Sequence, residues 1–159
     1  MPSRLEDYAV IGDNQTAALV GKDGSIDWVC FPRFDSGACF AALLGDESNG
    51  RWRIAPAAEV KAVRRRYLPD TLVLETEMDT AGGTIRLLDF MPPRNRAPDI
   101  VRIVEGVRGS VPVHMELVIR FDYGSTRSST PPSLTGATGR HVAPTTAATA
   151  PRSSHRSGS

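Results

Sequence analysis

The sequence predicts a mostly β protein: a partial antiparallel β-sandwich with one short helix and a disordered C-terminal tail. Three observations predict this fold. Apolar and polar residues alternate over short runs, turn-forming sequences separate these runs, and the composition changes abruptly after Gly124. A period of two residues is typical of strands with one buried face. Many short strands with turns between them favour an antiparallel sandwich over a closed barrel.

The first hairpin is expected in "TAALVGKDGSIDWVCF", residues 16–31, where two β-rich runs flank the sequence "KDGS". Asp followed by Gly is a frequent turn pair, so Asp23 is interpreted as a turn-forming residue. This segment therefore predicts two neighbouring antiparallel strands.

The helix is expected at residues 37–44, within "SGACFAALLG". Ser36 can cap its first turn, Phe40, Leu43 and Leu44 form a narrow apolar stripe, and Gly45 is placed to end it. Two or three turns are too short to be stable alone, so tertiary packing must hold this helix.

Two further hairpins are expected later in the chain. In "TLVLETEMDTAGGTIRLLDF", residues 71–90, two strand-like runs flank "DTAGG". In residues 99–121, "DIVRIVEGVRG" and "VPVHMELVIRF" are expected to pair through the turn that follows Arg108. The second of these runs places alternate apolar residues on one buried face: Val111, Val113, Met115, Leu117, Ile119 and Phe121.

The domain organisation follows the change in composition. Residues 1–124 have the recurring apolar residues of a globular domain and contain all 18 acidic residues. Residues 125–159 contain no aromatic residue, and 15 of them are Ser or Thr. Such a segment cannot bury enough apolar surface to offset its ordering entropy, so we expect this Ser/Thr/Pro/Arg-rich tail to be disordered.

Charge and composition argue against several function classes. The net charge is +1 and no basic face is visible, which argues against nucleic-acid binding. The run Arg64-Arg65-Arg66 is interpreted as a solvated strand edge, with a phosphate or nucleic-acid contact as the alternative. The N-terminus has no signal-peptide pattern and no stretch is apolar enough to span a membrane, so a cytoplasmic location is expected.

No metal, cofactor or nucleophile-based site is expected. Cys30 and Cys39 lack the spacing and histidine neighbours of a zinc site and are expected to be buried small residues. No Ser or Cys has an identifiable base, and no phosphate-binding loop is present. Glu75 and Glu77 share one strand face, where the pattern favours solvent exposure over a catalytic carboxylate pair.

The strongest site candidates are Trp28, Arg33 and Asp35 in "DWVCFPRFDSG". An aromatic ring with planar charged groups nearby can stack on a sugar and bind its hydroxyl groups. The alternative is structural: Arg33 pairs with Asp35 or Asp27 to brace a loop beside a half-buried Trp28.

Several blocks together resemble a known family. From about Leu5 to Gly124, "DYAVIGDNQTAALVGKDGSIDWVCFPRFDSGACFAALLG", "RRYLPDTLVLET", "LLDFMPPR", "DIVRIVEGVRG" and "ELVIRFDYG" resemble the N-terminal domain of bacterial trehalase and glucoamylase-like proteins of glycoside hydrolase family 15. The resemblance implies a β-sandwich that packs against a C-terminal (α/α) barrel. In the family that barrel carries two catalytic glutamates and hydrolyses α-glucosidic bonds with inversion.

The resemblance also implies what this chain lacks. No residue here matches the catalytic glutamates, so no catalytic residue is assigned. We expect a non-catalytic, inactive fragment of an enzyme that converts α,α-trehalose to glucose, with maltooligosaccharides or dextrins as alternative substrates. Trp28, Arg33 and Asp35 are then candidates for the barrel interface or the rim of the sugar site. The alternative function is a stand-alone sandwich that binds carbohydrate or a protein partner.

The tail departs from the family pattern after "RFDYG". Its mixture of Arg, Ser, Thr, Pro, Ala and Gly is what a GC-rich gene yields when it is read out of frame. We therefore expect a frameshift or misassembled gene near Ser125 and an incomplete sandwich, with a natural Ser/Thr-rich linker as the alternative.

Overall fold

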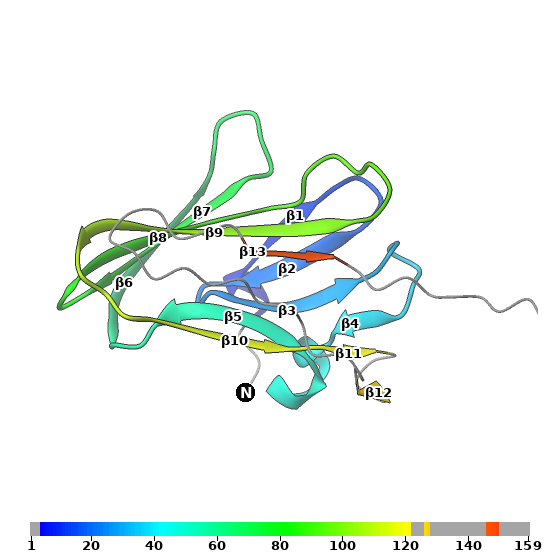
Figure 1. Ribbon diagram of the computed structural model, residues 1–159, viewed down its shortest axis with the longest axis horizontal. Helices are drawn as coiled ribbons and strands as arrows, with labels where there is room; N and C mark the ends of the chain where they lie inside the picture. The colour runs from blue at the N-terminus through cyan, green and yellow to red at the C-terminus, as the bar shows by residue number, and fades with distance from the viewer. Residues whose placement is uncertain (1–3, 122–125, 128–145, 150–159) are drawn as a thin grey trace, which may run out of the picture.

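The computed structural model of the protein describes residues 4–121, 126–127 and 146–149. Most of the tail expected to be disordered lies outside these ranges. The described chain is all β apart from three 3-10 turns (Figure 1). Its elements are η1 (Leu5–Asp7), β1 (Tyr8–Gly12), β2 (Ala17–Gly21), β3 (Ser25–Cys30), β4 (Ala38–Phe40), η2 (Ala42–Leu44), η3 (Glu47–Asn49), β5 (Arg51–Pro56), β6 (Val60–Tyr67), β7 (Leu74–Thr80), β8 (Gly83–Phe90), β9 (Asp99–Gly109), β10 (Val113–Val118), β11 (Arg120–Phe121), β12 (Thr126–Arg127) and β13 (Thr146–Thr149).

Two antiparallel sheets form the sandwich. Sheet A has the strand order β1-β2-β3-β5-β10, with β4 paired to β3. Sheet B has the order β13-β9-β8-β7-β6, and β11 pairs with β12 separately. The predicted antiparallel sandwich is therefore confirmed.

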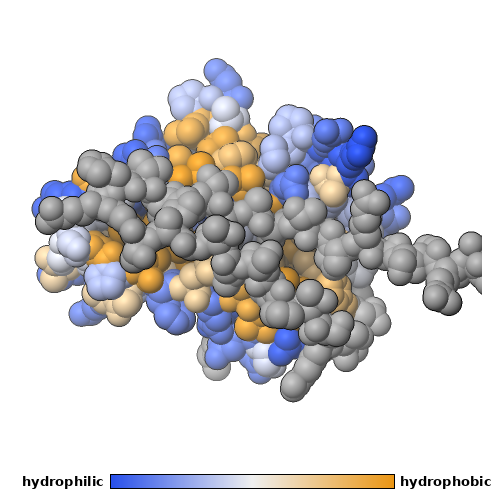
Figure 2. Space-filling view, viewed as in Figure 1, coloured by the Kyte–Doolittle hydropathy of each residue, from blue (hydrophilic) through white to orange (hydrophobic). Residues whose placement is uncertain are grey.

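One apolar core lies between the two sheets. Sheet A contributes Ile11, Val20, Ile26, Val29, Trp52 and Ile54, and sheet B contributes Leu74, Met78, Ile85, Leu87 and Ile100. Alternation along each strand explains this core, because every second side chain points into the same layer. On the outer surface, the face shown in Figure 2 has hydrophobic residues toward its middle and hydrophilic ones toward its rim.

The hairpins at residues 16–31 and 71–90 are confirmed. In the first, β2 pairs with β3, and the Asp23 carboxylate accepts a hydrogen bond from the Ser25 backbone at 3.1 Å. This contact confirms Asp23 as a turn-forming residue. In the second, β7 pairs with β8 in continuous register from Leu74 to Thr80.

The third predicted hairpin is wrong. β9 pairs with β8 in sheet B, whereas β10 pairs with β5 in sheet A. The segment between them crosses from one sheet to the other, because the apolar face of β10 is buried by packing across the core instead of beside β9. The face itself was predicted largely correctly: Val111, Met115, Leu117, Ile119 and Phe121 pack against the core, whereas Val113 is 40% exposed.

The helix predicted at residues 37–44 is also wrong in its first half. Ala38–Phe40 form strand β4 on the edge of β3, and only Ala42–Leu44 form a single 3-10 turn. Ala38, Cys39 and Phe40 are all buried, which a narrow helical stripe would not achieve. Pairing with an available strand edge satisfies the backbone and buries these three residues together.

The edges of the two sheets meet at β1 and β6. The Tyr67 hydroxyl of β6 donates to the Val10 carbonyl at 2.8 Å and accepts from the Val10 amide at 2.9 Å. Nearby, an Arg65 Nη1 donates to the Val20 carbonyl of β2 at 3.0 Å. These contacts connect the two layers at this side of the sandwich.

Candidate functional site

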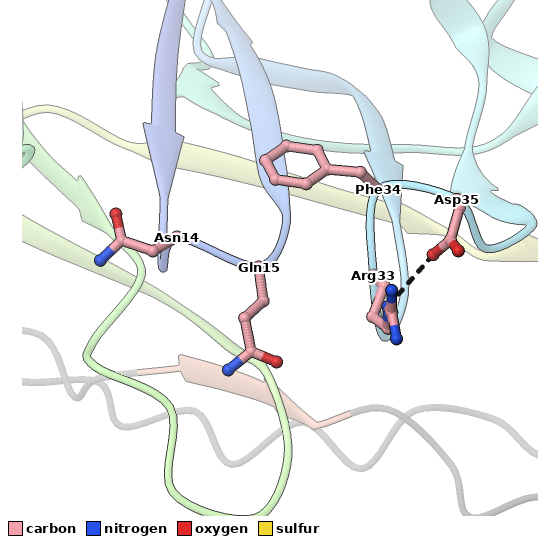
Figure 3. A pocket seen from close by; sticks show the side chains of 5 residues that line it. All are labelled: Asn14, Gln15, Arg33, Phe34 and Asp35. Carbon is pink, nitrogen blue, oxygen red and sulfur yellow. Dashed lines mark ion pairs between the residues drawn. The ribbon is translucent and has the colours of Figure 1, made fainter.

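A solvent-open hollow lies between the β1–β2 turn and the loop that follows β3 (Figure 3). Its volume is about 540 Å³. The side-chain amides of Asn14 and Gln15 lie on one side, and the ion pair of the loop, Arg33 with Asp35, lies on the other. The ring of Phe34 projects between them. The lining residues are Asn14, Gln15, Arg33, Phe34 and Asp35.

Asp13 holds the β1–β2 turn in place. One carboxylate oxygen accepts from the backbone amides of Gln15 and Thr16 at 3.0 and 2.9 Å, and the other accepts from Arg94 Nε at 2.8 Å. Burial alone would raise the pKa of Asp13, but the hydrogen bonds from Arg94 and the two amides outweigh it and lower the pKa. Arg94 also donates to the Gln15 side chain at 3.2 Å, which links this charge pair to the hollow.

The loop after β3 is attached to the same turn. The Phe34 amide donates to the Gln15 carbonyl at 3.1 Å, and the loop closes on itself between Arg33 and Ser36. Arg33 Nε lies 3.2 Å from an Asp35 oxygen, and both side chains are mostly exposed. The structure thus contains the Arg33–Asp35 pair of the structural alternative, and the same pair lines the hollow.

Trp28 is separate from this hollow. It lies on the outer face of sheet A, opposite Leu19 in the strand register, and packs against Cys30, Ala38 and Ala41. Asp27 accepts hydrogen bonds from the hydroxyls of Tyr8 and Ser25, so it does not pair with Arg33. The three predicted site residues therefore divide into Arg33 and Asp35 at the hollow and Trp28 elsewhere.

Sequence reasoning did not select Phe34, Asn14 or Gln15. Phe34 is an apolar side chain that is nevertheless 62% exposed, and its two neighbours in sequence are charged. An aromatic residue between Arg33 and Asp35 in a loop was the available signal. The contribution of Asn14 and Gln15 could not be read locally, because they reach the hollow through a different turn.

Glu75 and Glu77 belong to a network of ion pairs on the outer face of sheet B. Glu75 contacts Arg66 at 2.6 Å and Arg86 at 3.3 Å, and Glu77 contacts Arg86 at 2.9 Å and Arg64 at 3.1 Å. The expectation of solvent exposure is wrong for Glu75, whose side chain is only 8% exposed because the arginines cover it.

The electrostatics of Glu77 are unsuited to acid catalysis. Hydrogen bonds from Arg86 and Arg64 lower the pKa of Glu77, whereas a glycosidase general acid needs a raised pKa. Arg64 and Arg66 lie on an edge strand, as predicted for the basic run, but their charges are paired.

The cysteines are buried free thiols, as expected. Burial raises the pKa of both thiols, and that of Cys39 rises to about 12. Within residues 4–121, no group of three or more His, Cys, Asp or Glu side chains is arranged to hold a metal ion. No described helix has the length and hydrophobicity needed to cross a bilayer.

The fold is therefore an all-β sandwich domain. Its paired carboxylates, Glu75 and Glu77, form ion pairs with arginines of the same sheet. Residues 1–146 match the family described as "Trehalase-like, N-terminal", and the chain belongs to this family. No solved structure matches it significantly.

Relatives in three organisms are each named as a trehalase. The chain is 33% identical over 127 residues to a trehalase of Thermoplasma volcanium and 32% identical over 138 residues to a trehalase of Mycobacterium tuberculosis. It is 36% identical over 120 residues to trehalase 1 of Sulfolobus acidocaldarius. These matches cover 75–76% of this chain but only 20% of each relative, at its N-terminal end.

Proposed function

We propose that this chain is the non-catalytic N-terminal sandwich of a hydrolase that converts α,α-trehalose to glucose. A helical catalytic barrel of the same protein completes the enzyme in this proposal. One observation carries it: the chain matches the N-terminal fifth of several proteins named trehalase. The pairing of Glu75 and Glu77 with arginines supports a non-catalytic role.

The two outer faces of the sandwich suggest where the barrel docks. Sheet B presents the paired charges of Arg64, Arg66 and Arg86, which are already satisfied within the sheet. Sheet A presents an apolar row across β1, β2 and β3, because Val10 lies opposite Leu19 and Leu19 lies opposite Trp28. Apolar surface favours burial against a partner, so we assign the docking face to sheet A.

In this proposal, Trp28 is an interface residue. The Arg33–Asp35 pair lies at the rim of the sugar-binding site of the complete enzyme. Trp28 is half-buried against its own sheet, so a partner would cover the part that remains accessible. Aromatic residues are enriched at the centres of protein interfaces because they bury large apolar areas.

A complementation assay tests the proposed function. The M. tuberculosis trehalase without its N-terminal fifth is mixed with the full 159-residue chain, and glucose release from trehalose is measured. The positive control adds back the relative's own N-terminal segment. We expect no glucose from the chain alone and a gain of activity in the mixture. Glucose release by the chain alone, or rescue by the relative's segment only, would contradict the proposal.

A pair of variants tests the docking face. Val10→Lys places a charge in the apolar row of sheet A, where Val10 is 45% exposed. Leu72→Lys is the matched control, because Leu72 is 51% exposed in the segment before β7. We expect Val10→Lys to weaken rescue at least tenfold and Leu72→Lys to leave it unchanged. Equal rescue by both variants would move the docking face away from β1.

A further inference from the structure

We propose that the hollow beside Phe34 is a binding site for a neutral, glucose-containing saccharide. This site would act in the sandwich itself, before or without any partner domain. The inference deepens the proposed function and rests on it for the choice of glucose as the sugar unit. The five lining residues supply the groups that would contact the sugar.

Phe34 supplies a stacking surface. Its side chain is 62% exposed and lies between Arg33 and Asp35, in a turn that hydrogen bonds between Arg33 and Ser36 close. A pyranose ring has one face of C–H groups, which packs well on an aromatic ring, and hydroxyl groups around its edge. An exposed aromatic ring with polar groups on both sides matches this division.

The polar groups around Phe34 suit hydroxyl groups better than a charged ligand. Asn14 and Gln15 each carry a carbonyl oxygen and an NH₂ group, so they can both accept from and donate to hydroxyls. Arg33 is paired with Asp35 at 3.2 Å, and the two charges cancel. An anion would have to compete with the Asp35 carboxylate, so we expect phosphate to bind poorly.

The site is held in position before any ligand arrives. The Phe34 amide is bonded to the Gln15 carbonyl, so the loop and the turn are fixed relative to each other. Asp13 and Arg94 hold the turn from beneath, with side chains that are 0% and 9% exposed. Such preorganisation lowers the entropy lost on binding.

The size of the hollow sets the expected ligand and affinity. A volume of about 540 Å³ falls within the range of small-molecule sites, about 300–1,000 Å³. Because the hollow is open to solvent, most of the sugar surface would stay hydrated. We expect a dissociation constant on the order of 1 mM, in the range of weak complexes.

The experiment is a titration of the isotope-labelled 159-residue chain followed by NMR. Trehalose and maltose are the probes, and the side-chain NH₂ signals of Asn14 and Gln15 and the ring signals of Phe34 are the readouts. Sorbitol has hydroxyl groups but no ring face, and inorganic phosphate tests anion binding. We expect saturable shifts of these signals with the two sugars and none with sorbitol or phosphate.

Variants identify the stacking residue. Phe34→Ala is expected to weaken sugar binding at least tenfold, and Phe34→Tyr is expected to retain it. Leu44→Ala is the matched control, because Leu44 is another apolar side chain with a similar exposure of 68%. The exposure of Phe34 predicts little effect on folding, which the unchanged amide spectrum of each variant would verify.

The outcomes separate this inference from the proposed function. Absence of shifts with either sugar, shifts with phosphate only, or wild-type binding by Phe34→Ala would each overturn the saccharide site. Complementation of a truncated trehalase could still succeed in that case. Conversely, sugar binding without complementation would leave the saccharide site supported and remove the proposed enzymatic context.

Discussion

Arg102 and Asp89 form a fully buried ion pair between β9 and β8, with Arg102 Nε 2.7 Å from Asp89 Oδ1. The same guanidinium crosses to sheet A, where it donates to the Trp52 carbonyl at 2.6 Å and the Gly24 carbonyl at 2.8 Å. It also lies 5.4 Å from the centre of the Trp52 ring. A single side chain therefore connects both layers of the sandwich at the centre of the core.

Removing this guanidinium is expected to destabilise the protein strongly. Arg102→Met leaves a buried carboxylate and two carbonyls without their donor, which costs about 3–5 kcal/mol in the free energy of unfolding. The double variant Arg102→Met with Asp89→Leu removes the orphaned charge and should recover part of the loss. Urea denaturation measures both variants. A single variant as stable as the wild type would contradict the structural role of the pair.

Gly24 is expected to tolerate no side chain. Its φ is +80°, and an added Cβ would lie 2.1 Å from the Ile54 carbonyl oxygen. Gly24→Ala should therefore lower stability by at least about 1–3 kcal/mol, the range for a strained backbone position. Gly106→Ala is the control, because nothing lies within 4 Å of its added Cβ. Thermal melting of the two variants checks the difference, and equal melting temperatures would contradict it.

Acid should destabilise the fold over a defined pH range. A hydrogen bond from Arg64, with a smaller one from Thr84, lowers the pKa of Asp79 from 3.8 to about 2. A carboxyl group with a lowered folded-state pKa contributes stability above its unfolded pKa and loses it as the pH falls toward the folded value. Asp13 and Glu77, whose pKa values are also lowered, act in the same direction.

The free energy of unfolding is therefore expected to fall between about pH 5 and pH 2. Urea denaturation at several pH values measures the slope. Asp79→Asn and Arg64→Gln should each flatten it, because each removes one partner of the same ion pair. A slope unchanged in both variants would show that this pair does not perturb the Asp79 carboxyl group.

The two cysteines should react slowly in the native protein. Both thiols are buried, and the pKa of Cys39, raised to about 12, leaves almost no thiolate at pH 8. A colorimetric thiol reagent should label both residues rapidly in urea and only slowly without it. Immediate labelling of both thiols under native conditions would contradict their burial.

Glu75 and Glu77 are expected to affect stability and not hydrolysis. Glu75→Gln and Glu77→Gln each weaken two contacts to arginines, so a modest loss of stability follows. Rescue of a truncated trehalase should be unchanged when protein concentrations are matched. A loss of rescued activity at a concentration where the variant remains folded would assign these carboxylates to the reaction.

Local sequence signals predicted part of the fold correctly. The turns "KDGS" and "DTAGG" join strands that are neighbours in both sequence and space, so turn chemistry was sufficient for β2–β3 and β7–β8. The alternation around Met115 identified the buried face of β10. The partner of β10 was missed because Met115 lies opposite Ile54, a residue far away in the sequence.

The candidate site was predicted only in part for a similar reason. Arg33 and Asp35 are close in sequence, and their pairing could be anticipated from the loop alone. The hollow depends on Gln15, which reaches the loop through a backbone contact between distant segments. Trp28 was grouped with them because it is near in sequence, but strand alternation places it on the outer face of sheet A.

The contact between Tyr67 and Val10 protects the edge of sheet A against aggregation. A strand at the end of a sheet offers amides and carbonyls that another polypeptide can use as a template for fibril growth. On β1, the Tyr67 hydroxyl occupies both backbone groups of Val10. The Tyr67 hydroxyl thereby blocks the two Val10 backbone groups with which a strand of another molecule would pair. It does so without adding a strand to the sheet.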